Sequence, residues 1–207
     1  TESQSWAKSF LKEPAITPTY NYAGVLLLLD IDGFKFINDT YGHGVGDELL
    51  RHMAGFLQNT VKDTVTSYIK KSEEIILGRM GGDEFAVFLP YLCNGQEMEG
   101  SVQIKKRFET FRFAEAPIHV TISIGIVSYP AHGTTTKELF TRADTALYRA
   151  KEMGRNRCHL YRAEDRDLEN LHSRLKEKER IQKALTDGRF MPWFQPILNL
   201  KDNKIHH

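Results

Sequence analysis

The sequence predicts an α/β (α+β) domain in which helices pack on one antiparallel or mixed sheet. Strand-like apolar segments and helix-like segments follow each other between residues 22 and 161. Two of the strand-like segments flank Gly81-Gly82, as the strands of a β-hairpin do. The composition, 41% hydrophobic and 27% charged, is that of an ordinary globular protein.

The first elements are expected before residue 62. Residues 22–32 form an apolar run of strand length that ends in acidic residues, which predicts a buried central strand. Residues 34–42 are expected to form a short helix or turn that ends at Gly42. Apolar residues recur at helical spacing over 47–61, and Asp47 is the expected N-cap of that helix.

The later elements alternate between strand and helix signals. In order, the pattern predicts hairpin strands at 73–80 and 84–90, an irregular helix at 94–111, a strand at 118–130, a helix at 135–154 and a short strand at 155–161. The helix at 135–154 carries an apolar stripe suited to packing on a sheet, and Gly154 is expected to close it.

The character of the chain changes at Arg162. Residues 162–190 are highly charged with a thin apolar stripe, which predicts a linker helix rather than core. Residues 191–207 predict one strand and a turn, with no partner strand left in the chain. We therefore expect a domain at 1–161, a linker at 162–190 and the first strand of another domain at 191–207. Because the chain opens on Thr1 rather than Met, we expect it to be part of a longer protein.

Charge, cysteine content and hydropathy exclude several classes of function. The formal net charge of +1 provides no broad field for nucleic acid or an anionic membrane. The two cysteines, Cys93 and Cys158, match neither a disulfide framework nor a zinc site. The longest apolar run, residues 23–29, is too short to span a bilayer, and no signal peptide is visible. We expect a cytoplasmic segment with no nucleic-acid or membrane contact; a membrane anchor, if the parent has one, would lie elsewhere.

Acidic residues gather where the first strand ends. Asp30 and Asp32 are two positions apart, so on a strand they would point to the same face. Buried carboxylates are costly unless they bind a cation or hydrogen-bond donors. Two interpretations stay open: the pair binds Mg²⁺, or it caps the following turn, which two aspartates alone favour.

A second acidic pair follows the two glycines. A hairpin turn needs Gly-Gly but not the Asp83-Glu84 that comes next. Beside Asp30 on a neighbouring strand, Asp83 would complete a pair of carboxylates around a hard cation, as in phosphoryl-transfer enzymes. Gly81 and Gly82 would let the backbone approach a bulky ligand. The alternative is an acidic hairpin tip that only faces solvent.

Cations that could hold a phosphate lie outside any known phosphate-binding loop. Lys35 follows the first acidic cluster, and Lys151 and Arg155 are four residues apart near a helix end, a spacing that places both side chains on one face. The alternative for this pair is a favourable interaction with the helix C-terminus. No G-x-x-x-x-G-K-[ST] motif occurs, and "GHGVGD" does not match a dinucleotide fingerprint. The residues together describe a nucleotide and metal site without a P-loop.

Four motifs carry a resemblance to a known family. "DIDGFKFINDTYGHGVGDELL" at 30–50 precedes "GGDEF" at 81–85, and "SIGIVSYP" and "ADTALYRAKEMGRNR" follow in order. These motifs resemble the GGDEF family of diguanylate cyclases over residues 22–161, although the opening D-x-L-T-G-L of that family is missing. The resemblance implies a nucleotidyl-cyclase fold related to polymerase palms, and the condensation of two GTP into cyclic di-GMP and two pyrophosphates. It also implies Mg²⁺ (or Mn²⁺) as cofactor and a catalytic homodimer, which we expect to be weak in this chain.

The resemblance implies roles for individual residues. The implied metal ligands are Asp30, the carbonyl of Ile31 and Asp83. The implied catalytic residues are Asp83 with Glu84, which help to deprotonate the attacking 3′-hydroxyl, and Lys35, which stabilises charge in the transition state. The implied contacts to the guanine nucleoside are Asn38, His43 and Asp47. The implied contacts to the triphosphate are the backbone of Phe34 and Lys35 and the side chains of Lys151 and Arg155. Gly81 and Gly82 are implied to make room for the nucleotide.

Two further comparisons with known patterns concern regulation and the tail. Many members of the family carry R-x-x-D before the signature as an inhibitory product site, whereas this chain has Ser72–Ile75 there. Product inhibition through that site is therefore not expected. The tail, with Gln195-Pro196, resembles the first helix and strand of an EAL phosphodiesterase domain. A GGDEF–EAL tandem parent is implied, with no phosphodiesterase site in this chain.

Three functions compete on this reading. The first is an active cyclase, which the complete "GGDEF" together with Asp30, Lys35, Asn38 and Asp47 favours. The second is a catalytically silent module that binds GTP and regulates a neighbouring domain. The third is a purely structural dimerisation domain, which would leave the hairpin acids unexplained.

Overall fold

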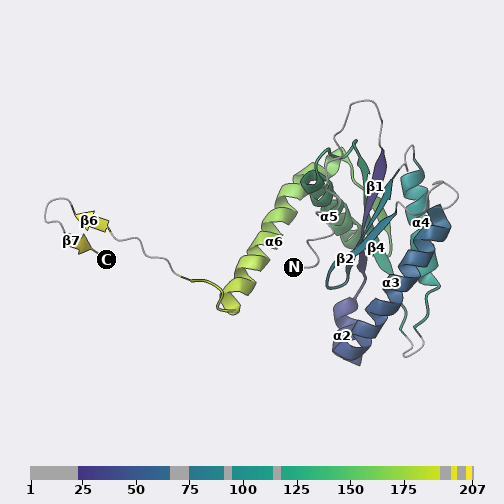
Figure 1. Ribbon diagram of the computed structural model, residues 1–207, viewed down its shortest axis with the longest axis horizontal. Coiled ribbons are helices and arrows are strands. Elements are labelled where there is room, and N and C mark those ends of the chain that lie inside the picture. Colours follow the sequence, from purple (N-terminus) through teal and green to yellow (C-terminus); the bar gives the residue numbers. More distant parts are fainter. Residues whose placement is uncertain are drawn as a thin grey trace. The chain divides into compact units, whose positions relative to one another are not determined.

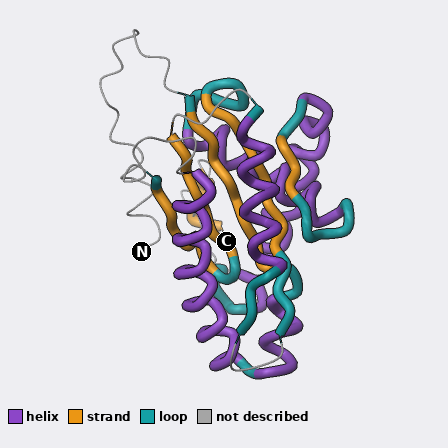
Figure 2. The backbone as a smooth tube through the Cα atoms, turned by 90° about the vertical axis from the view of Figure 1, so that its right-hand side faces the viewer, coloured by secondary structure: helices purple, strands orange, loops and turns teal. Residues whose placement is uncertain are grey.

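A five-stranded sheet organises the first of the two units in the computed structural model (Figures 1 and 2). The units are residues 1–169 and 170–207. The structure describes residues 23–65, 75–90, 95–113, 118–191, 197–199 and 204–206. The strands of the sheet, in spatial order, are β2 (Ile76–Gly81), β3 (Glu84–Pro90), β1 (Gly24–Ile31), β4 (Ile122–Tyr129) and β5 (Cys158–Leu160).

The sheet is mixed, with the first strand at its centre. β1 pairs antiparallel with both β3 and β4, β2 and β3 form the hairpin, and β4 pairs parallel with β5. All eight residues of β1 are buried, because neighbouring strands and helices surround it. The predicted fold class, a mixed sheet with a central glycine hairpin and flanking helices, is confirmed.

Helices cover both faces of the sheet (Figure 1). α5 (Thr136–Glu152) packs on one face through Ala143, Ala146 and Leu147, which meet the even-numbered leucines of β1. α3 (His43–Val65) and α4 (Gln96–Glu109) cover the other face and meet its odd-numbered residues. α2 (Phe34–Tyr41) is the short helix that leads from β1 to α3. The end of β1 therefore lies between α5 on one side and α3 with α4 on the other.

One glycine lets α5 lie very close to the sheet. Gly125 is in β4, and a Cβ atom there would overlap the carbonyl oxygen of Ala143 and the amide nitrogen of Leu147. Only a residue without a side chain fits, because both overlapping groups belong to the helix backbone. The close packing fixes the height of α5 above β1, and the last turn of α5 carries Lys151.

The structure corrects the predicted start of α3. The sequence pattern placed Asp47 at the N-cap, but the helix begins at His43 and Asp47 lies one turn inside it. The glycines in this stretch weaken helix propensity, which is why it was expected to be a loop. Packing outweighs that preference: Val45 lies against the core, and Gly46 fits beneath the side chain of Asn38.

Two predicted strands are shorter than expected. β4 begins at Ile122 instead of residue 118, and β5 covers Cys158–Leu160 instead of 155–161. Arg155 and Asn156 have φ angles of 59° and 46°, which are left-handed and do not occur in a strand. The predicted closure of α5 is confirmed, since Gly154 has a φ of 109° and its N–H donates to the carbonyl of Lys151.

The tail contains α6 (Arg166–Thr186), which follows a 3₁₀ turn at Ala163–Asp165, and then a small two-stranded sheet. In that sheet β6 (Ile197–Asn199) pairs antiparallel with β7 (Lys204–His206), so the expected lack of a partner strand was wrong. β7 has only three residues, too few for a period-2 signal in the sequence. Within the described residues, no helix combines the length and apolar character needed to cross a membrane.

We predict that Gly125→Ala destabilises the domain by more than about 2 kcal/mol, because the helix backbone cannot move aside as a side chain could. The matched control is Gly55→Ala in α3, where nothing lies within 4 Å of the added Cβ. That change should be neutral or stabilise by about 0.5–1 kcal/mol. Urea unfolding of both variants measures the difference; equal effects would contradict the packing argument.

Candidate active site

The hairpin brings its acidic residues to the end of the central strand. In the register of β1 and β3, Asp30 is directly opposite Glu84, and Asp83 precedes Glu84 in the turn. Cross-strand partners in an antiparallel pair have Cβ atoms roughly 5 Å apart. The sequence interpretation that placed the hairpin acids beside Asp30 matches this arrangement of the strands.

The turn itself is shaped by glycines and by an arginine. Gly82 has a left-handed φ of 54°, Gly81 has a φ of 155°, and the register between β2 and β3 shifts just before Gly81. The Nε of Arg79 donates to the carbonyl oxygen of Gly82 at 2.9 Å and closes the turn. Sequence reasoning missed Arg79, whose only signal was a cation two residues before the glycine pair.

Asp30 is a buried carboxylate held by one lysine. The residue is 6% exposed, and one carboxylate oxygen lies 2.6 Å from Nζ of Lys151. Burial, with smaller contributions from the charges of Asp83 and Glu84, raises the pKa of Asp30 to about 6 against the opposing effect of Lys151. A carboxylate with this pKa gains more than an exposed one from an added cation. The arrangement is that of an incomplete cation site.

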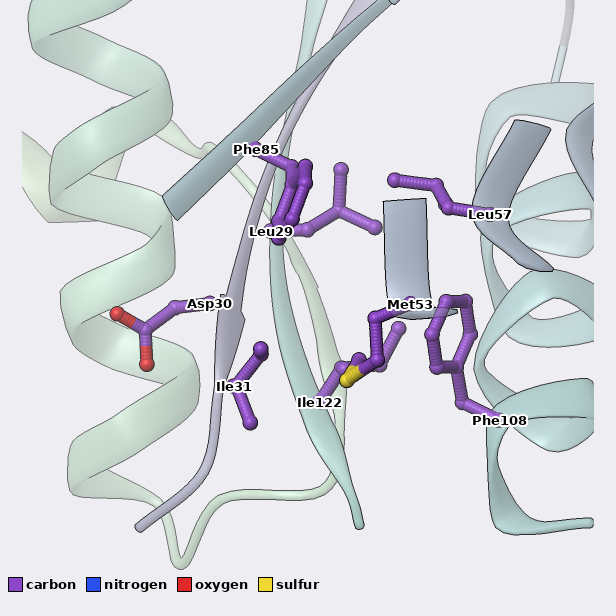
Figure 3. Close-up of a pocket in the computed structure, with 8 residues that line it drawn as sticks. All are labelled: Leu29, Asp30, Ile31, Met53, Leu57, Phe85, Phe108 and Ile122. Atoms are coloured by element: carbon purple, nitrogen blue, oxygen red, sulfur yellow. The ribbon is translucent and has the colours of Figure 1, made fainter. Parts of the chain in front are cut away.

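Asp30 points away from the core (Figure 3). Leu29 and Ile31 lie on the opposite side of β1 and line a small cavity of about 10 Å³ together with residues of α3, β3, α4 and β4. That volume is at the lower limit for a single water molecule, and apart from Asp30 its lining is apolar. The cavity is a packing defect of the core, and the chemistry of the site lies on the other side of the strand.

Asp32 differs from Asp30 in every contact. It lies just beyond β1, and its carboxylate accepts hydrogen bonds from the Thr121 hydroxyl at 2.8 Å, the Ser123 hydroxyl at 2.7 Å and the Asn156 N–H at 2.9 Å. These donors already satisfy most of its lone pairs. The two aspartates, which the sequence treated as one cluster, thus divide into a structural residue and a candidate ligand.

The candidate base-binding residues come from α2 and α3. Asn38 is half-buried, whereas His43 and Asp47 are exposed. Oδ1 of Asn38 is buried with no hydrogen-bond partner in the described part of the chain. A buried amide oxygen without a partner costs about 1–3 kcal/mol, which makes Asn38 a candidate for a hydrogen bond that this structure does not contain. Gly46 is what makes room for it, because a Cβ there would overlap this oxygen.

The candidate phosphate-binding residues are only partly brought together. Lys151 reaches Asp30, and Lys35 is exposed on α2 directly after the end of β1. Arg155 is exposed but lies beyond the end of α5, so the expected shared helix face with Lys151 was wrong. The i,i+4 rule requires helical backbone at both positions, and the helix ends at Glu152. Phe34 is partly buried against the core, where it supports the start of α2.

No complete metal cage is present in the described ranges: His, Cys, Asp and Glu do not form a group of three that could hold an ion. Mg²⁺ is commonly bound by one or two carboxylates together with substrate phosphates. Asp30 with the neighbouring hairpin acids supplies hard oxygen donors of this kind. The residues therefore fit a divalent cation that is shared with a substrate.

The chain is similar to a signaling protein and to a diguanylate cyclase. A signaling protein of Bacillus subtilis, YkoW, is 30% identical over 188 residues, which are 89% of this chain and 22% of that protein. A diguanylate cyclase of Vibrio cholerae is 35% identical over 134 residues, 65% of this chain and 39% of that enzyme. The chain thus spans less than half the length of these relatives.

Solved structures and a family model agree with the fold. The structure of an active GGEEF domain of a diguanylate cyclase from Vibrio cholerae matches with a TM-score of 0.58 and 30% identity, over 78% of this chain and 90% of that one. The family model described as "Diguanylate cyclase, GGDEF domain" matches residues 5–157, which include β1, the glycine hairpin and α5. The chain therefore belongs to the GGDEF domain family of diguanylate cyclases.

Proposed function

We propose that this domain condenses two molecules of GTP into cyclic di-GMP and releases two pyrophosphates. The observation that carries the proposal is the pairing of Asp30 with Glu84 across the central strands, which surrounds a buried carboxylate of raised pKa with further acids. A solvated hairpin tip has no need for such a neighbour. Two phosphodiester bonds form in the reaction, and one bond between the α- and β-phosphates breaks in each GTP.

Asp30 and Asp83, with the carbonyl of Ile31, are the residues that would hold Mg²⁺ or Mn²⁺. The ion would supply charge neutralisation at the phosphates and a lower pKa for the attacking hydroxyl. Asp83 and Glu84 are half-buried at the turn, where a carboxylate can accept the proton of a 3′-hydroxyl. Lys35, exposed at the start of α2, can stabilise negative charge on the phosphate as the bond forms.

The guanine base would bind between α2 and the start of α3. The unpaired Oδ1 of Asn38 can accept a hydrogen bond from guanine, and the carboxylate of Asp47 can accept another, as the guanine edge presents both N1–H and N2–H₂ donors. Adenine offers a different pattern on that edge. His43, exposed at the first residue of α3, would contact the same nucleoside.

One domain provides the contacts for one nucleotide, whereas the product joins two. We therefore propose that two copies face each other with their hairpins inward, in an isologous two-fold arrangement. Each 3′-hydroxyl then lies beside the α-phosphate held by the other copy, and proximity supplies much of the rate. Gly81 and Gly82 are exposed at the tip and leave room for this approach.

The remaining expectations about organisation are also proposals. We assign the cyclase domain to residues 1–161, a charged linker helix to 162–190 and the start of an EAL domain to 191–207. The division of the chain into units near residue 169 and the polar α6 are compatible with this assignment. Gln195-Pro196 lies outside the described residues, as does most of Ser72–Ile75, where the inhibitory R-x-x-D is missing. We do not expect product inhibition through that position.

We predict that Asp83→Ala lowers cyclic di-GMP synthesis by at least about 10²-fold, because it removes a carboxylate at the site of charge development. The assay incubates the chain with GTP and Mg²⁺ and detects the product by mass spectrometry, with a chelator as the metal control. Asp63→Ala, at an exposed position in α3, is the matched control and should retain activity. Full activity of Asp83→Ala would overturn the assignment, and GTP binding without any turnover by the unmodified chain would indicate a silent regulatory module.

We further predict that the unmodified chain binds GTP more tightly than ATP and that Asn38→Ala reduces this preference roughly ten-fold, since one buried hydrogen bond is lost. Calorimetric titration with both nucleotides gives the ratio directly. Asn59→Ala changes an exposed asparagine in α3 and should leave the ratio unchanged. An unaltered ratio in Asn38→Ala would exclude this residue from base recognition.

The raised pKa of Asp30 predicts an unusual dependence of stability on pH in the metal-free protein. The folded state holds the Asp30 proton up to a pH of about 6, whereas the pKa of the free side chain is 3.8. The stabilisation from this group is therefore complete below pH 3.8 and is lost as the pH rises through 6. Relative to the unmodified protein, Asp30→Asn should gain up to about 3 kcal/mol between pH 4 and pH 7. Unfolding curves that stay parallel across this range would contradict the prediction.

A further inference from the structure

A short loop after α5 is held from two directions at once. Residues 153–157, here called the α5–β5 loop, lead from the helix on one face of the sheet to the edge strand β5. The N–H of Asn156 donates to Oδ2 of Asp32 at 2.9 Å. This bond joins the loop to the residue that follows the end of β1, two positions beyond Asp30.

The side chain of Asn156 is held by α4, on the opposite face of the sheet from α5 (Figure 1). Its Nδ2 donates to Oε1 of Glu109 at 3.1 Å, and its Oδ1 accepts from Nζ of Lys105 at 3.2 Å. Lys105 and Glu109 also form an ion pair with each other, and the lysine side chain is only 15% exposed. Both ends of Asn156 are therefore tied to rigid elements.

The backbone at this point is strained. Arg155 and Asn156 are the two non-glycine residues with left-handed φ angles in the described part of the chain. Asparagine tolerates this region better than most residues, but arginine does not, so the conformation persists only where surrounding contacts impose it. The bonds from Asp32, Glu109 and Lys105 are those contacts.

The constrained residue beside Asn156 is a candidate phosphate ligand. Arg155 is exposed, its own N–H is fixed by the carbonyl of Ala150, and Lys151 of the same helix end contacts Asp30. Asp32 thus ties a cation-bearing loop to the strand end where the acidic residues gather. Because its backbone is already fixed, such a loop loses less conformational entropy when a polyphosphate binds its guanidinium.

We infer that Asp32 and Asn156 are positioning residues that hold the α5–β5 loop so that Arg155 binds the triphosphate of the nucleotide. The inference deepens the proposed function and rests on it, since it assigns Asp32 a part in substrate binding that involves no direct contact. It also explains why Asp32, whose oxygens accept three hydrogen bonds, is not a metal ligand.

The test compares GTP with GMP in the presence of Mg²⁺, using calorimetry on the full chain. Asp32→Asn keeps the shape of the side chain but turns an N–H₂ group toward hydrogen-bond donors. We expect affinity for GTP to fall about ten-fold and affinity for GMP to change less than about two-fold. Asn156→Gly keeps the left-handed backbone accessible and removes only the side-chain tie, so it should produce a smaller loss of the same kind.

A double-mutant cycle separates positioning from general stability. If Asp32 acts through Arg155, the losses of GTP affinity caused by Arg155→Ala and Asp32→Asn will not add. Once the guanidinium of Arg155 is removed, Asp32 has nothing left to position. Additive losses, or equal losses for GTP and GMP, would show that Asp32 only stabilises the fold. Asp63→Asn is the matched control: its carboxylate also joins two segments, through Arg107, but on the exposed surface of α3 and α4.

Two outcomes distinguish this inference from the proposed function. GTP-selective losses in these variants, in a chain that forms no cyclic di-GMP, would support the positioning role and reject the cyclase activity. If the chain forms cyclic di-GMP but Asp32→Asn leaves its GTP affinity unchanged, the cyclase activity is supported and the positioning role is rejected. Hydrogen exchange of the Asn156 backbone amide adds a structural measurement. Its protection should be lost in Asp32→Asn, and retained protection would contradict a positioning role for the hydrogen bond between Asn156 and Asp32.

Discussion

The ion pair between Asp30 and Lys151 is the interaction on which the rest of the site depends. It joins the buried end of the central strand to the last turn of α5 at 2.6 Å. A carboxylate is costly at this depth, and the acids of the hairpin increase the cost, so one cation is required for Asp30 to be charged near neutral pH. The close packing of α5 over Gly125 is what allows Lys151 to supply it.

The polar groups around this pair fall into two classes. Asp32 accepts hydrogen bonds from three donors in distant segments and Arg79 closes the hairpin, so these groups fix the backbone around the site. Asp30 carries a raised pKa, and Oδ1 of Asn38 is buried without a partner in the described chain. Unsatisfied or unfavourably placed groups of this kind lower stability, and they cluster at functional sites.

The division matters for how the domain would work. Under the proposed function, metal and triphosphate would complete the site together, because it has one buried carboxylate, neighbouring acids and a few separated cations. Each copy would then hold one nucleotide, which suits a reaction whose product is symmetric. The distance between two copies would control the rate without any change inside the fold.

The sequence by itself determined the elements whose pattern is local. The continuous apolar run of β1, the glycine hairpin and the stripe of α5 followed from periodicity, and the four motifs identified the family. The sequence pattern did not predict where α3 begins, because packing around Gly46 outweighs the weak helix propensity of glycine.

The family resemblance named Asp30 and not Asp32 as a metal ligand, but only the tertiary structure supplies a physical reason for the difference. The two residues are alike in sequence, but their partners come from segments about 90 to 125 positions away, namely Thr121, Ser123, Lys151 and Asn156. Local spacing carries no information about such partners, and it also failed at Arg155, where the helix ends before the spacing rule can apply. Burial and hydrogen bonding are properties of the assembled sheet and its helices, and they decide which acid is free to bind a ligand.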